Sequence, residues 1–407
     1  MSDVARIGLL GKGTVGGAFA EQLAERAFQV EAISGRKPEI SGVLTRSQGD
    51  FDEILESSEV IVELIGGTDP ARDYVVRALE SGRHVVTANK QLIAQHGDEL
   101  FPKAREHGVQ LRFEAAVAGV VPVIRVIQES LAATRITRVS GIVNGTTNFI
   151  LSEMAATGAE YADVLRRAQE LGYAEADPTD DVGGADAAAK MAILARLAFD
   201  TPVSLSDVTY EGITEISPDD IAYAKELGLS LKLLGVAERR GDGISVRVFP
   251  CFLYGGHPLA PIEGPFNAVT VEAPAITEIT MSGPGAGGIQ TATAVLNDVV
   301  SVLAGEAPVD QPAERLEIVK DVSSSFYLHL EVADRPGVLA SVADVLGRNG
   351  ISVLSVVQRG LGDEARLVMV LHECPERDFY AALDEIRELE FLRAAPRAIR
   401  VIEEEFV

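Results

Sequence analysis

Residues 5–23, ARIGLLGKGTVGGAFAEQL, decide the fold of the first third of the chain. The apolar run 5–10 is typical of a strand buried within a parallel sheet. It leads directly into the pattern G-x-G-x-x-G, after which Val15, Phe19 and Leu23 recur at helical spacing. A strand, a glycine-rich turn and a helix in this order predict a dinucleotide-binding unit, with the phosphates at the helix N-terminus. A glycine-rich turn that binds no ligand is the alternative.

Each glycine of the pattern has a physical role in such a site. Gly11 allows the tight turn, Gly13 lets a pyrophosphate approach the backbone, and Gly16 lets the helix lie close to the strand. Further buried strands, with helices between them, are expected at residues 40–45, 59–66, 84–88 and 109–115. The region is therefore expected to form a Rossmann-type α/β domain. The candidate cofactor-binding residues in its first loop are Gly11, Lys12, Gly13, Thr14, Val15 and Gly16.

The residue after the second expected strand bears on the choice of cofactor. An acidic residue there would bind a ribose 2′-hydroxyl, whereas an arginine suits a 2′-phosphate. Arg46 follows the strand 40–45, which favours NADP over NAD. Its distance from Gly16 exceeds the usual ~20 residues, so a solvated loop arginine is the alternative.

The composition excludes several classes of protein. The 407 residues suggest two or three domains, and a hydrophobic content of 47% is sufficient for large cores. A net charge of −25 argues against nucleic acid and against an anionic membrane surface as partners. The two cysteines, Cys251 and Cys374, are far apart, the first residues do not resemble a signal peptide, and there is no apolar run of about 18 residues. We therefore expect a cytoplasmic protein in a reducing compartment.

A second stretch, LGYAEADPTDDVGGADAAAK at residues 171–190, contains five carboxylates and ends on one lysine. Pro178 and the pair Gly183–Gly184 predict a loop, after which a helix is expected. Asp186 and Lys190 are four residues apart and therefore share one face of that helix. The neighbouring stripe that is expected to be core consists of Ala187, Met191, Leu194 and Ala198. Spacing alone leaves two interpretations, a functional pair or an exposed ion pair worth ~0.3–0.5 kcal/mol.

Another helix is expected after a strand-like run, ITRVSGIV at residues 136–143. That run leads into NGTT at residues 144–147. The turn contains a glycine, so Thr146 or Thr147 is expected to cap the helix that follows.

Several segments occur in a fixed order over about the first three hundred residues. They are ELIGGTDPA, HVVTANKQLIAQHG, FEAAVAG, GIVNGTTNFI, the stretch 171–190 and GPGAGG. Together they resemble homoserine dehydrogenase, an NAD(P)-dependent enzyme that interconverts aspartate 4-semialdehyde and homoserine. A series of consecutive motifs is far more specific than a single glycine loop.

The resemblance implies roles for individual residues of this chain. Lys190 matches the proton donor to the carbonyl oxygen, and Glu175 and Asp186 match residues that hold the amino and hydroxyl groups of the substrate. Lys90 matches a second active-site lysine near cofactor and substrate, and Gly287 matches a glycine that closes over the nicotinamide end. The other implied substrate-pocket positions are Asp181, Gly145 and Thr146.

The resemblance also implies a sodium ion held mostly by backbone carbonyls. The matching positions are Glu114, Val117, Gly119 and Val121. Two departures from the family pattern are small. The segment AGVVP differs from the usual residues before the proline of the sodium segment, and Lys12 stands where a small or apolar residue is common.

The last part of the chain, residues 323–407, has a different order of expected strands and helices. Its segments are expected in the order strand, helix, strand, strand, helix, strand, a compact ferredoxin-like βαββαβ unit. The segment VADRPGVLASVADVLGRNGISV resembles an ACT domain, an amino-acid-sensing module of biosynthetic enzymes. That resemblance implies an effector, expected to be L-threonine, between two ACT domains near Asp334, Gly337 and Val338. Dimerisation without sensing is the alternative.

These observations predict the domain organisation. We expect a Rossmann domain over 1–130 completed by 285–306, an α+β catalytic and dimerisation domain over 131–284, a linker over 307–322, and the ACT domain over 323–407. The chain has no region left for an aspartate kinase, and a homo-oligomer, either dimer or tetramer, is expected. The alternatives are another NAD(P)-dependent oxidoreductase of amino-acid metabolism or a non-catalytic amino-acid sensor.

Overall fold

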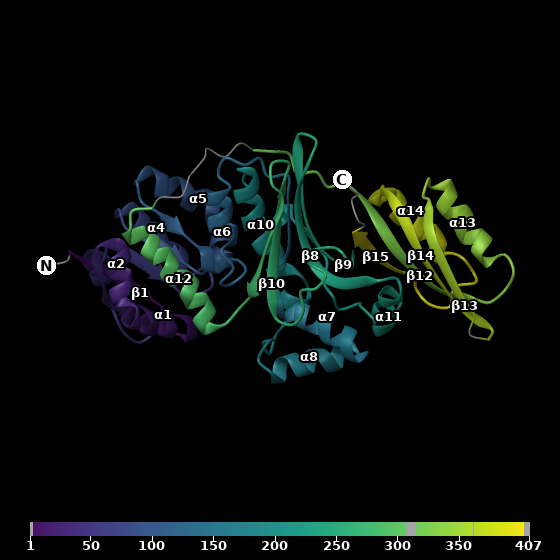
Figure 1. Ribbon diagram of the computed structural model, residues 1–407, viewed down its shortest axis with the longest axis horizontal. Coiled ribbons are helices and arrows are strands. Elements are labelled where there is room, and N and C mark those ends of the chain that lie inside the picture. Colours follow the sequence, from purple (N-terminus) through teal and green to yellow (C-terminus); the bar gives the residue numbers. More distant parts are fainter. Residues whose placement is uncertain (1–2, 307–314, 361, 403–407) are drawn as a thin grey trace.

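The computed structural model describes residues 3–306, 315–360 and 362–402. The molecule is elongated, and the chain runs along its long axis from the N-terminal parallel sheet through a central sheet to the C-terminal strands (Figure 1). Part of the expected linker, residues 307–314, lies outside the described residues. None of the helices in the described ranges combines the length and the apolar character that crossing a bilayer requires.

The N-terminal region is built on a parallel five-stranded sheet in the order β2-β1-β3-β4-β5. Its strands are β1 (Asp3–Leu10), β2 (Arg36–Leu44), β3 (Val60–Glu63), β4 (His84–Thr87) and β5 (Leu111–Arg112). The predicted Rossmann-type α/β sheet is thereby confirmed. β2 begins at Arg36 rather than at residue 40, and it contains Pro38, which is tolerated because β2 is an edge strand.

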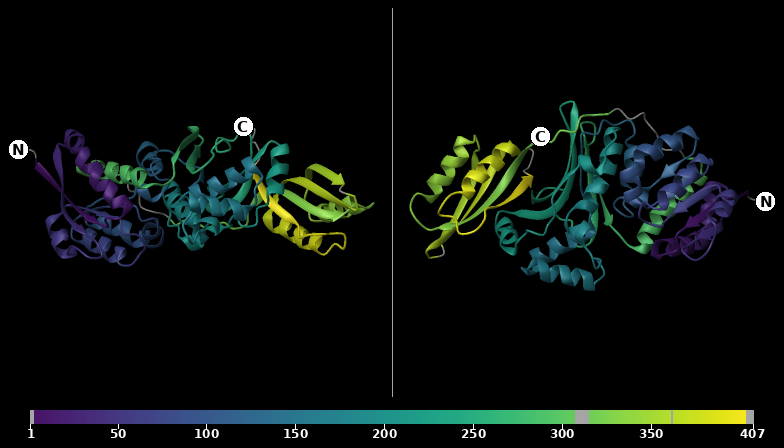
Figure 2. Two further views of the ribbon diagram at one scale, coloured as in Figure 1. Left: turned by 90° about the horizontal axis from the view of Figure 1, so that it is seen from below. Right: turned by 180° about the vertical axis from the view of Figure 1, so that it is seen from behind.

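Helices cover both faces of this sheet because successive strand residues point to opposite sides. Ile7 and Leu9 pack towards α1 and α12, whereas Leu10 and Ile61 pack towards α4 and α5. The helices are α1 (Thr14–Glu25), α2 (Ala27–Ser34), α3 (Phe51–Ser57), α4 (Ala71–Glu80), α5 (Lys90–Glu106) and, from much later in the chain, α12 (Gly288–Leu303). Two views of the molecule show α12 lying against the N-terminal region (Figure 2).

The central and C-terminal regions share one ten-stranded sheet. Its order is β11-β10-β6-β8-β9-β15-β12-β14-β13, with β7 paired to β9. The strands are β6 (Arg138–Ile142), β7 (Thr209–Tyr210), β8 (Leu229–Arg240), β9 (Gly243–Tyr254), β10 (Phe266–Ala273), β11 (Thr277–Pro284), β12 (Ser323–Ala333), β13 (Val353–Gly360), β14 (Glu364–Pro375) and β15 (Arg397–Ile402). The helices are α6 (Val123–Arg125), α7 (Gly145–Thr157), α8 (Tyr161–Glu170), α9 (Thr179–Val182), α10 (Ala185–Phe199), α11 (Pro218–Glu226), α13 (Val338–Arg348) and α14 (Glu376–Arg387).

The C-terminal strands and helices follow the predicted βαββαβ order, but the unit is not separate from the rest of the chain. β15 pairs in parallel with β9, with Arg400 opposite Cys251 and Ile402 opposite Leu253. The hydrogen-bonded sheet therefore continues from the central region into the C-terminal unit. This junction is not expected from the sequence, because the pattern of a strand predicts which face is buried and not which strand lies beside it.

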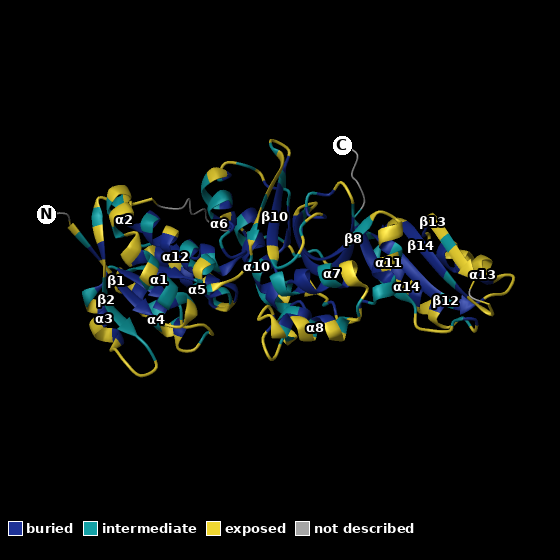
Figure 3. Cartoon of the chain, turned by 60° about the horizontal axis from the view of Figure 1, so that its bottom comes forward, coloured by how far each residue is buried: buried dark blue, intermediate teal, exposed yellow. Residues whose placement is uncertain are grey.

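One face of the central sheet is covered by α10. The predicted core stripe of this helix is confirmed, since Ala187, Met191, Leu194 and Ala198 are all buried. Met191 lies directly on β8, where a β-carbon on Gly235 would come within 2.3 Å of its side chain. Most strands of the sheet are largely buried, whereas the edge strands β11 and β13 are largely exposed. The helices α8 and α13 also present exposed residues to solvent (Figure 3).

Candidate active site

The glycine loop between β1 and α1 has the predicted shape. Gly11 has a φ of +96°, and a β-carbon there would lie 2.5 Å from the carbonyl oxygen of Leu64. A β-carbon on Gly16 would lie 2.0 Å from the carbonyl oxygen of Gly11, so only glycine lets α1 approach the strand this closely. A β-carbon on Gly13 would instead meet no described atom within 4 Å, apart from its own chain neighbours. The loop therefore fits a dinucleotide pyrophosphate at the N-terminus of α1.

The loop lies at the point where the strand order reverses. β1 is flanked by β2 on one side and β3 on the other, and the crevice between the carboxyl ends of such strands is where α/β folds bind ligands. The amide of Gly11 donates to the carbonyl oxygen of Leu44, the last residue of β2, at 2.9 Å. Arg46 follows two residues later and is exposed, as is Lys12 within the loop. Both cationic residues therefore lie in loops that follow the carboxyl ends of β1 and β2.

The N-terminus of α12 lies beside the same loop. Gly287 precedes the helix with a φ of +132°, and a β-carbon on Gly288 would lie 2.8 Å from Cγ2 of Thr14. The side-chain amide of Gln22 in α1 donates to the carbonyl oxygen of Ile289 at 3.0 Å. The fold therefore brings Gly287 to the glycine loop from the far end of the sequence.

Asp186 is the centre of a buried charged cluster at the start of α10. Its carboxylate accepts from Nζ of Lys190 and from the side-chain amide of Asn144 at 2.7 and 2.8 Å, and it also pairs with Lys90. Lys190 donates in addition to the carbonyl oxygen of Val143 at 2.7 Å. The side chain of Asp186 is 4% exposed and that of Lys190 is 12% exposed, whereas Lys90 is 38% exposed. The exposed-pair interpretation of Asp186 and Lys190 is therefore wrong.

The charges in this cluster stabilise one another. Burial alone would raise the pKa of Asp186, but the charges of Lys190 and Lys90 outweigh it and lower that pKa below its usual value. Burial would likewise lower the pKa of Lys90, but the charge of Asp186 outweighs it and raises that pKa. The pKa of Asp181 is raised, first by burial and also by the nearby charge of Asp186. The cluster thus holds an ionised Asp186 and a charged Lys90 beside a carboxyl group that gains a proton more easily.

Asn144 is a site residue that the sequence analysis does not identify. Its side-chain amide bridges Asp186 and Asp181, the latter at 2.7 Å. Its side-chain oxygen caps α7 by accepting from the amide of Thr147 at 2.8 Å, so the predicted cap at Thr146 or Thr147 is wrong. Asparagine directly before a helix is itself a capping signal, and that signal is present in the sequence.

The predicted loop, ADPTDDVGG at residues 176–184, contains one helical turn. Residues 179–182 form α9, with Pro178 directly before it and with Asp180 and Asp181 in its first turn, where carboxylates favour a helix N-terminus. Asp181 reaches the cluster through Asn144. Glu175 is exposed, and among the described contacts its carboxylate makes none with Asp186 or Lys190.

Gly145 and Thr146 are held at the start of α7. A β-carbon on Gly145 would lie 2.9 Å from the carbonyl oxygen of Pro265. The hydroxyl of Thr146 donates to the carbonyl oxygen of Tyr173 at 2.6 Å, which joins α7 to the stretch 171–190. Both residues are therefore close to Asn144 in the chain and in space.

The segment with the expected sodium ligands has an unusual backbone. Ala118 and Gly119 both have left-handed conformations, with φ of 57° and 63°. A β-carbon on Gly119 would lie 2.7 Å from carbonyl oxygens of the GPGAGG loop. The carboxylate of Glu114 does not face outward, since it accepts from the amides of Ile124 and Arg125 at 2.9 and 2.8 Å. Burial, reinforced by the nearby charge of Asp298, raises the pKa of Glu114 to about 7.

The expected effector residues lie at the start of α13. Gly337 precedes the helix with a φ of +94°, Asp334 is exposed and Val338 is buried. A β-carbon on Gly360 in β13 would lie 2.8 Å from Oδ2 of Asp334. These residues are at the opposite end of the molecule from the glycine loop (Figure 1).

The fold and the cluster define a class of protein, the nicotinamide-dependent oxidoreductases, since one chain combines a dinucleotide-binding loop with a cluster of lysines and carboxylates that can stabilise developing charge on an oxygen. Family models assign the chain more narrowly: "Homoserine dehydrogenase, NAD binding domain" matches residues 11–114, "Homoserine dehydrogenase" residues 122–300 and "ACT domain" residues 327–391. The chain belongs to the homoserine dehydrogenase family.

Individual relatives agree with this assignment. The chain is 39% identical to the homoserine dehydrogenase of Neisseria gonorrhoeae and 41% identical to that of Corynebacterium glutamicum, over 97% of its length and at least 95% of theirs. A crystal structure of a homoserine dehydrogenase from Thiobacillus denitrificans superposes with a TM-score of 0.94, at 37% identity over 99% of this chain and all of that one. A hyperthermophilic archaeal homoserine dehydrogenase in complex with NADPH covers 75% of this chain and 99% of its own, with a TM-score of 0.65 at 27% identity. The predicted family, fold class and activity are confirmed, and the activity is the NAD(P)H-dependent interconversion of L-aspartate 4-semialdehyde and L-homoserine.

Proposed function

We propose that Lys190 donates the proton to the carbonyl oxygen of aspartate 4-semialdehyde and that Asp186 holds Lys190 in place. The observation that carries this proposal is the pair of 2.7 Å hydrogen bonds from Nζ of Lys190 to Asp186 and to the carbonyl oxygen of Val143. An ammonium group has three N–H donors, and among the described residues two of these have partners. The third can therefore bind a substrate oxygen and stabilise the negative charge that builds on it.

The amino-acid end of the substrate requires groups of both charges. Lys90, with a third of its side chain exposed and its charge held by Asp186, can bind the α-carboxylate. Glu175 and Asp181 are acidic groups for the α-ammonium group, and Gly145 and Thr146 line the same corner of the pocket. Glu175 is exposed on the stretch 171–190, so its part in binding requires it to turn towards the cluster.

NADP is the proposed preferred cofactor. The nicotinamide ring supplies the hydride that adds to the aldehyde carbon. Arg46 follows β2 at the crevice and Lys12 lies within the glycine loop, so both can face a 2′-phosphate or pyrophosphate. Gly287 belongs to the same crevice and is proposed to adjoin the nicotinamide end.

Absorbance at 340 nm with homoserine tests the cofactor assignment. We expect kcat/KM with NADP+ to exceed that with NAD+. Arg46→Glu should reverse this order by raising the KM for NADP+ about tenfold or more, since a 2′-phosphate loses its cationic partner and meets a like charge. Arg26→Glu is the control, because Arg26 is an exposed arginine of the same region at the end of α1. Equal losses with both cofactors would contradict the 2′-phosphate assignment.

A sodium ion is proposed to bind the backbone carbonyls of Glu114, Val117, Gly119 and Val121. The support is the pair of left-handed residues Ala118 and Gly119, because strained backbone is retained where it serves a site and carbonyl oxygens suit hard cations. Thermal unfolding in NaCl against equal concentrations of choline chloride tests this directly. A higher Tm in NaCl that is lost in Gly119→Ala is expected, and equal Tm values would contradict the site.

We further propose that the domain boundaries fall as the sequence predicts and that the chain forms a homo-oligomer, with L-threonine as effector at Asp334, Gly337 and Val338. The support for assembly is β13, an edge strand whose Leu354 and Val356 are 50% and 46% exposed. Light scattering on the purified protein would give its mass, and a monomer would contradict assembly. Titration with threonine should lower activity, and no change at millimolar concentrations would leave a structural role for the C-terminal unit.

A further inference from the structure

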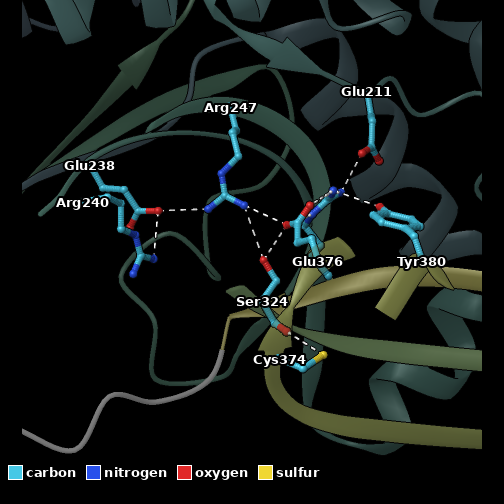
Figure 4. A network of polar contacts seen from close by, with 9 residues as sticks. Glu211, Glu238, Arg240, Arg247, Ser324, Cys374, Glu376 and Tyr380 are labelled. Atoms are coloured by element: carbon cyan, nitrogen blue, oxygen red, sulfur yellow. Dashed lines mark hydrogen bonds and ion pairs between the residues drawn. The ribbon is translucent and has the colours of Figure 1, made fainter. Parts of the chain in front are cut away.

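A single arginine of the last strand contacts both the C-terminal unit and the central region. Arg400 in β15 is 8% exposed, and its Nε and Nη2 donate to the carboxylate of Glu376 at 2.8 Å. Nη2 also donates to the hydroxyl of Tyr380 at 3.0 Å. Nη1 donates to Glu211 at 2.8 Å, and Figure 4 shows Glu211 approaching this point from the side opposite Glu376. Glu376 and Tyr380 belong to α14, whereas Glu211 belongs to the central region.

Glu211 lies in a short segment, residues 211–213, that packs between β9 and the stretch 171–190. We call this segment the wedge. Its amide donates to the carbonyl oxygen of Val248 in β9 at 2.8 Å. Two residues further, the amide of Ile213 donates to the carbonyl oxygen of Val182, the last residue of α9, at 2.9 Å. A β-carbon on Gly212 would lie 2.1 Å from that same oxygen, so the segment and α9 are in direct backbone contact.

The wedge also contacts the residue directly before α10, the helix that carries Asp186 and Lys190. Gly184, the residue before α10, has a left-handed φ of 88°, and a β-carbon there would lie 2.8 Å from the carbonyl oxygen of Glu211. Asp186 follows two residues later and Asp181 precedes by three. In sequence, Asp181 and Asp186 therefore lie on either side of Gly184, the backbone position that the carbonyl oxygen of Glu211 approaches.

We propose that Glu211, held by Arg400, is a positioning residue that sets the backbone between Asp181 and Asp186. This rests on the proposed roles of those two carboxylates in the active site. Loss of the Glu211 side chain removes the contact between residues 211–213 and β15. The backbone between Asp181 and Asp186 is then no longer held, and the spacing of these two carboxylates is no longer fixed. A shift of the C-terminal unit is thereby transmitted to the active site through the Arg400–Glu211 ion pair.

Another ion pair offers a matched control. Glu226 of α11 pairs with Arg359 of β13 at 2.6 Å and likewise joins the central region to the C-terminal unit. The two glutamates are similarly exposed, 44% for Glu211 and 52% for Glu226, but Glu226 is not part of the wedge. The Glu226–Arg359 pair is exposed on both sides, and such pairs contribute ~0–1 kcal/mol to stability. Arg400 is buried but keeps Glu376 and Tyr380 as partners when Glu211 is removed, so both alanine variants should fold.

The experiment compares Glu211→Ala, Glu211→Gln and Glu226→Ala by steady-state kinetics and thermal unfolding. We expect Glu211→Ala to raise the KM for homoserine or lower kcat so that kcat/KM falls about fivefold or more, since small misplacements of site groups have large kinetic effects. The KM for the cofactor should not change, because the wedge does not touch the glycine loop. Glu211→Gln, which keeps a hydrogen-bond acceptor for Arg400, should recover part of the loss, and Glu226→Ala should match the wild type.

Two outcomes would overturn the inference. One is equal kinetics for Glu211→Ala and Glu226→Ala. The other is a kinetic loss accompanied by a much larger fall in Tm for Glu211→Ala than for Glu226→Ala, which would indicate general destabilisation. Failure of the proposed catalytic roles is distinguishable from both, because it would appear as normal turnover in Asp186→Asn.

Discussion

Two buried charged clusters, one around Asp186 and one around Arg400, differ in what they leave unpaired. At Asp186, one carboxylate accepts from two lysines and an asparagine, and a third of the Lys90 side chain remains exposed. At Arg400, every nitrogen of the guanidinium donates to a partner, and Glu376 accepts from Arg247 and Ser324 as well (Figure 4). We call the first cluster open, because one N–H of Lys190 has no protein partner among the described residues and Lys90 is partly exposed. We call the second closed, because all three nitrogens of Arg400 donate to partners within the protein.

The difference distinguishes a ligand-binding site from a contact that holds two parts of the chain together. A closed network of buried charges fixes one geometry, and removing one member strands the others in a medium of low polarity. An open cluster keeps its charges ready but completes its hydrogen bonds only when a substrate binds. Deleting Arg400 itself should therefore lower stability, whereas deleting Lys190 should lower turnover.

The largest effect is expected for Arg400→Ala. Deleting this buried cation leaves Glu376 short of two hydrogen bonds, and breaking a buried pair costs about 3–5 kcal/mol. Urea unfolding followed by circular dichroism would measure the loss. Arg387→Ala is the control, because Arg387 forms an exposed pair with Asp384 and should change stability by less than about 1 kcal/mol. Similar losses for the two variants would show that the network around Arg400 is not closed.

The next effect is expected for Lys190→Ala, which breaks the open cluster. Asp186 keeps Lys90 and Asn144 as partners, so the fold should be retained, while kcat should fall by ~10²-fold or more through loss of the general acid. The KM for the cofactor should change little. Lys225→Ala, at an exposed position of α11, is the control. Near-normal turnover would remove Lys190 from the mechanism.

A smaller effect is expected at Lys232, a buried lysine outside both clusters. Burial lowers its pKa to about 8, opposed only weakly by Glu263, whereas the pKa of Lys90 is raised by Asp186. Between about pH 8 and the unfolded-state value near 10.4 the unfolded chain binds more protons, so this lysine makes stability rise with pH. At pH 7 its buried charge opposes folding.

Lys232→Met should therefore stabilise the protein at pH 7 by roughly 1–2 kcal/mol, and the gain should shrink as the pH approaches 10. Tm measured from pH 6 to 10 would follow the change. Lys37→Met, at an exposed position of β2, should show no such dependence. A destabilised Lys232→Met at pH 7 would mean that the hydrogen bond from Lys232 to the carbonyl oxygen of Ile262 outweighs the cost of its buried charge.

The two clusters also differ in how far the sequence predicts them. Asp186 and Lys190 share a helix face four residues apart, and the glycine pattern predicts the dinucleotide-binding loop, because local spacing determines local geometry. Asn144 brings Asp181 to Asp186 across more than thirty residues, and no local pattern predicts such a contact. The Arg400 network joins strands from three parts of the chain, and its geometry exists only once β15 lies beside β9. Periodicity predicts the elements of the C-terminal unit but not the neighbour of its last strand.

The pairing of β9 with β15 has a consequence for synthesis. β9 ends at Tyr254 and emerges from the ribosome well before β15, which begins at Arg397, so the backbone groups of β9 that pair with β15 remain without their native partner until β15 has been made. Until then, this edge of β9 either remains unpaired or pairs temporarily with another segment. Order of translation, as well as thermodynamics, thus makes synthesis of β15 a condition for completing the central sheet.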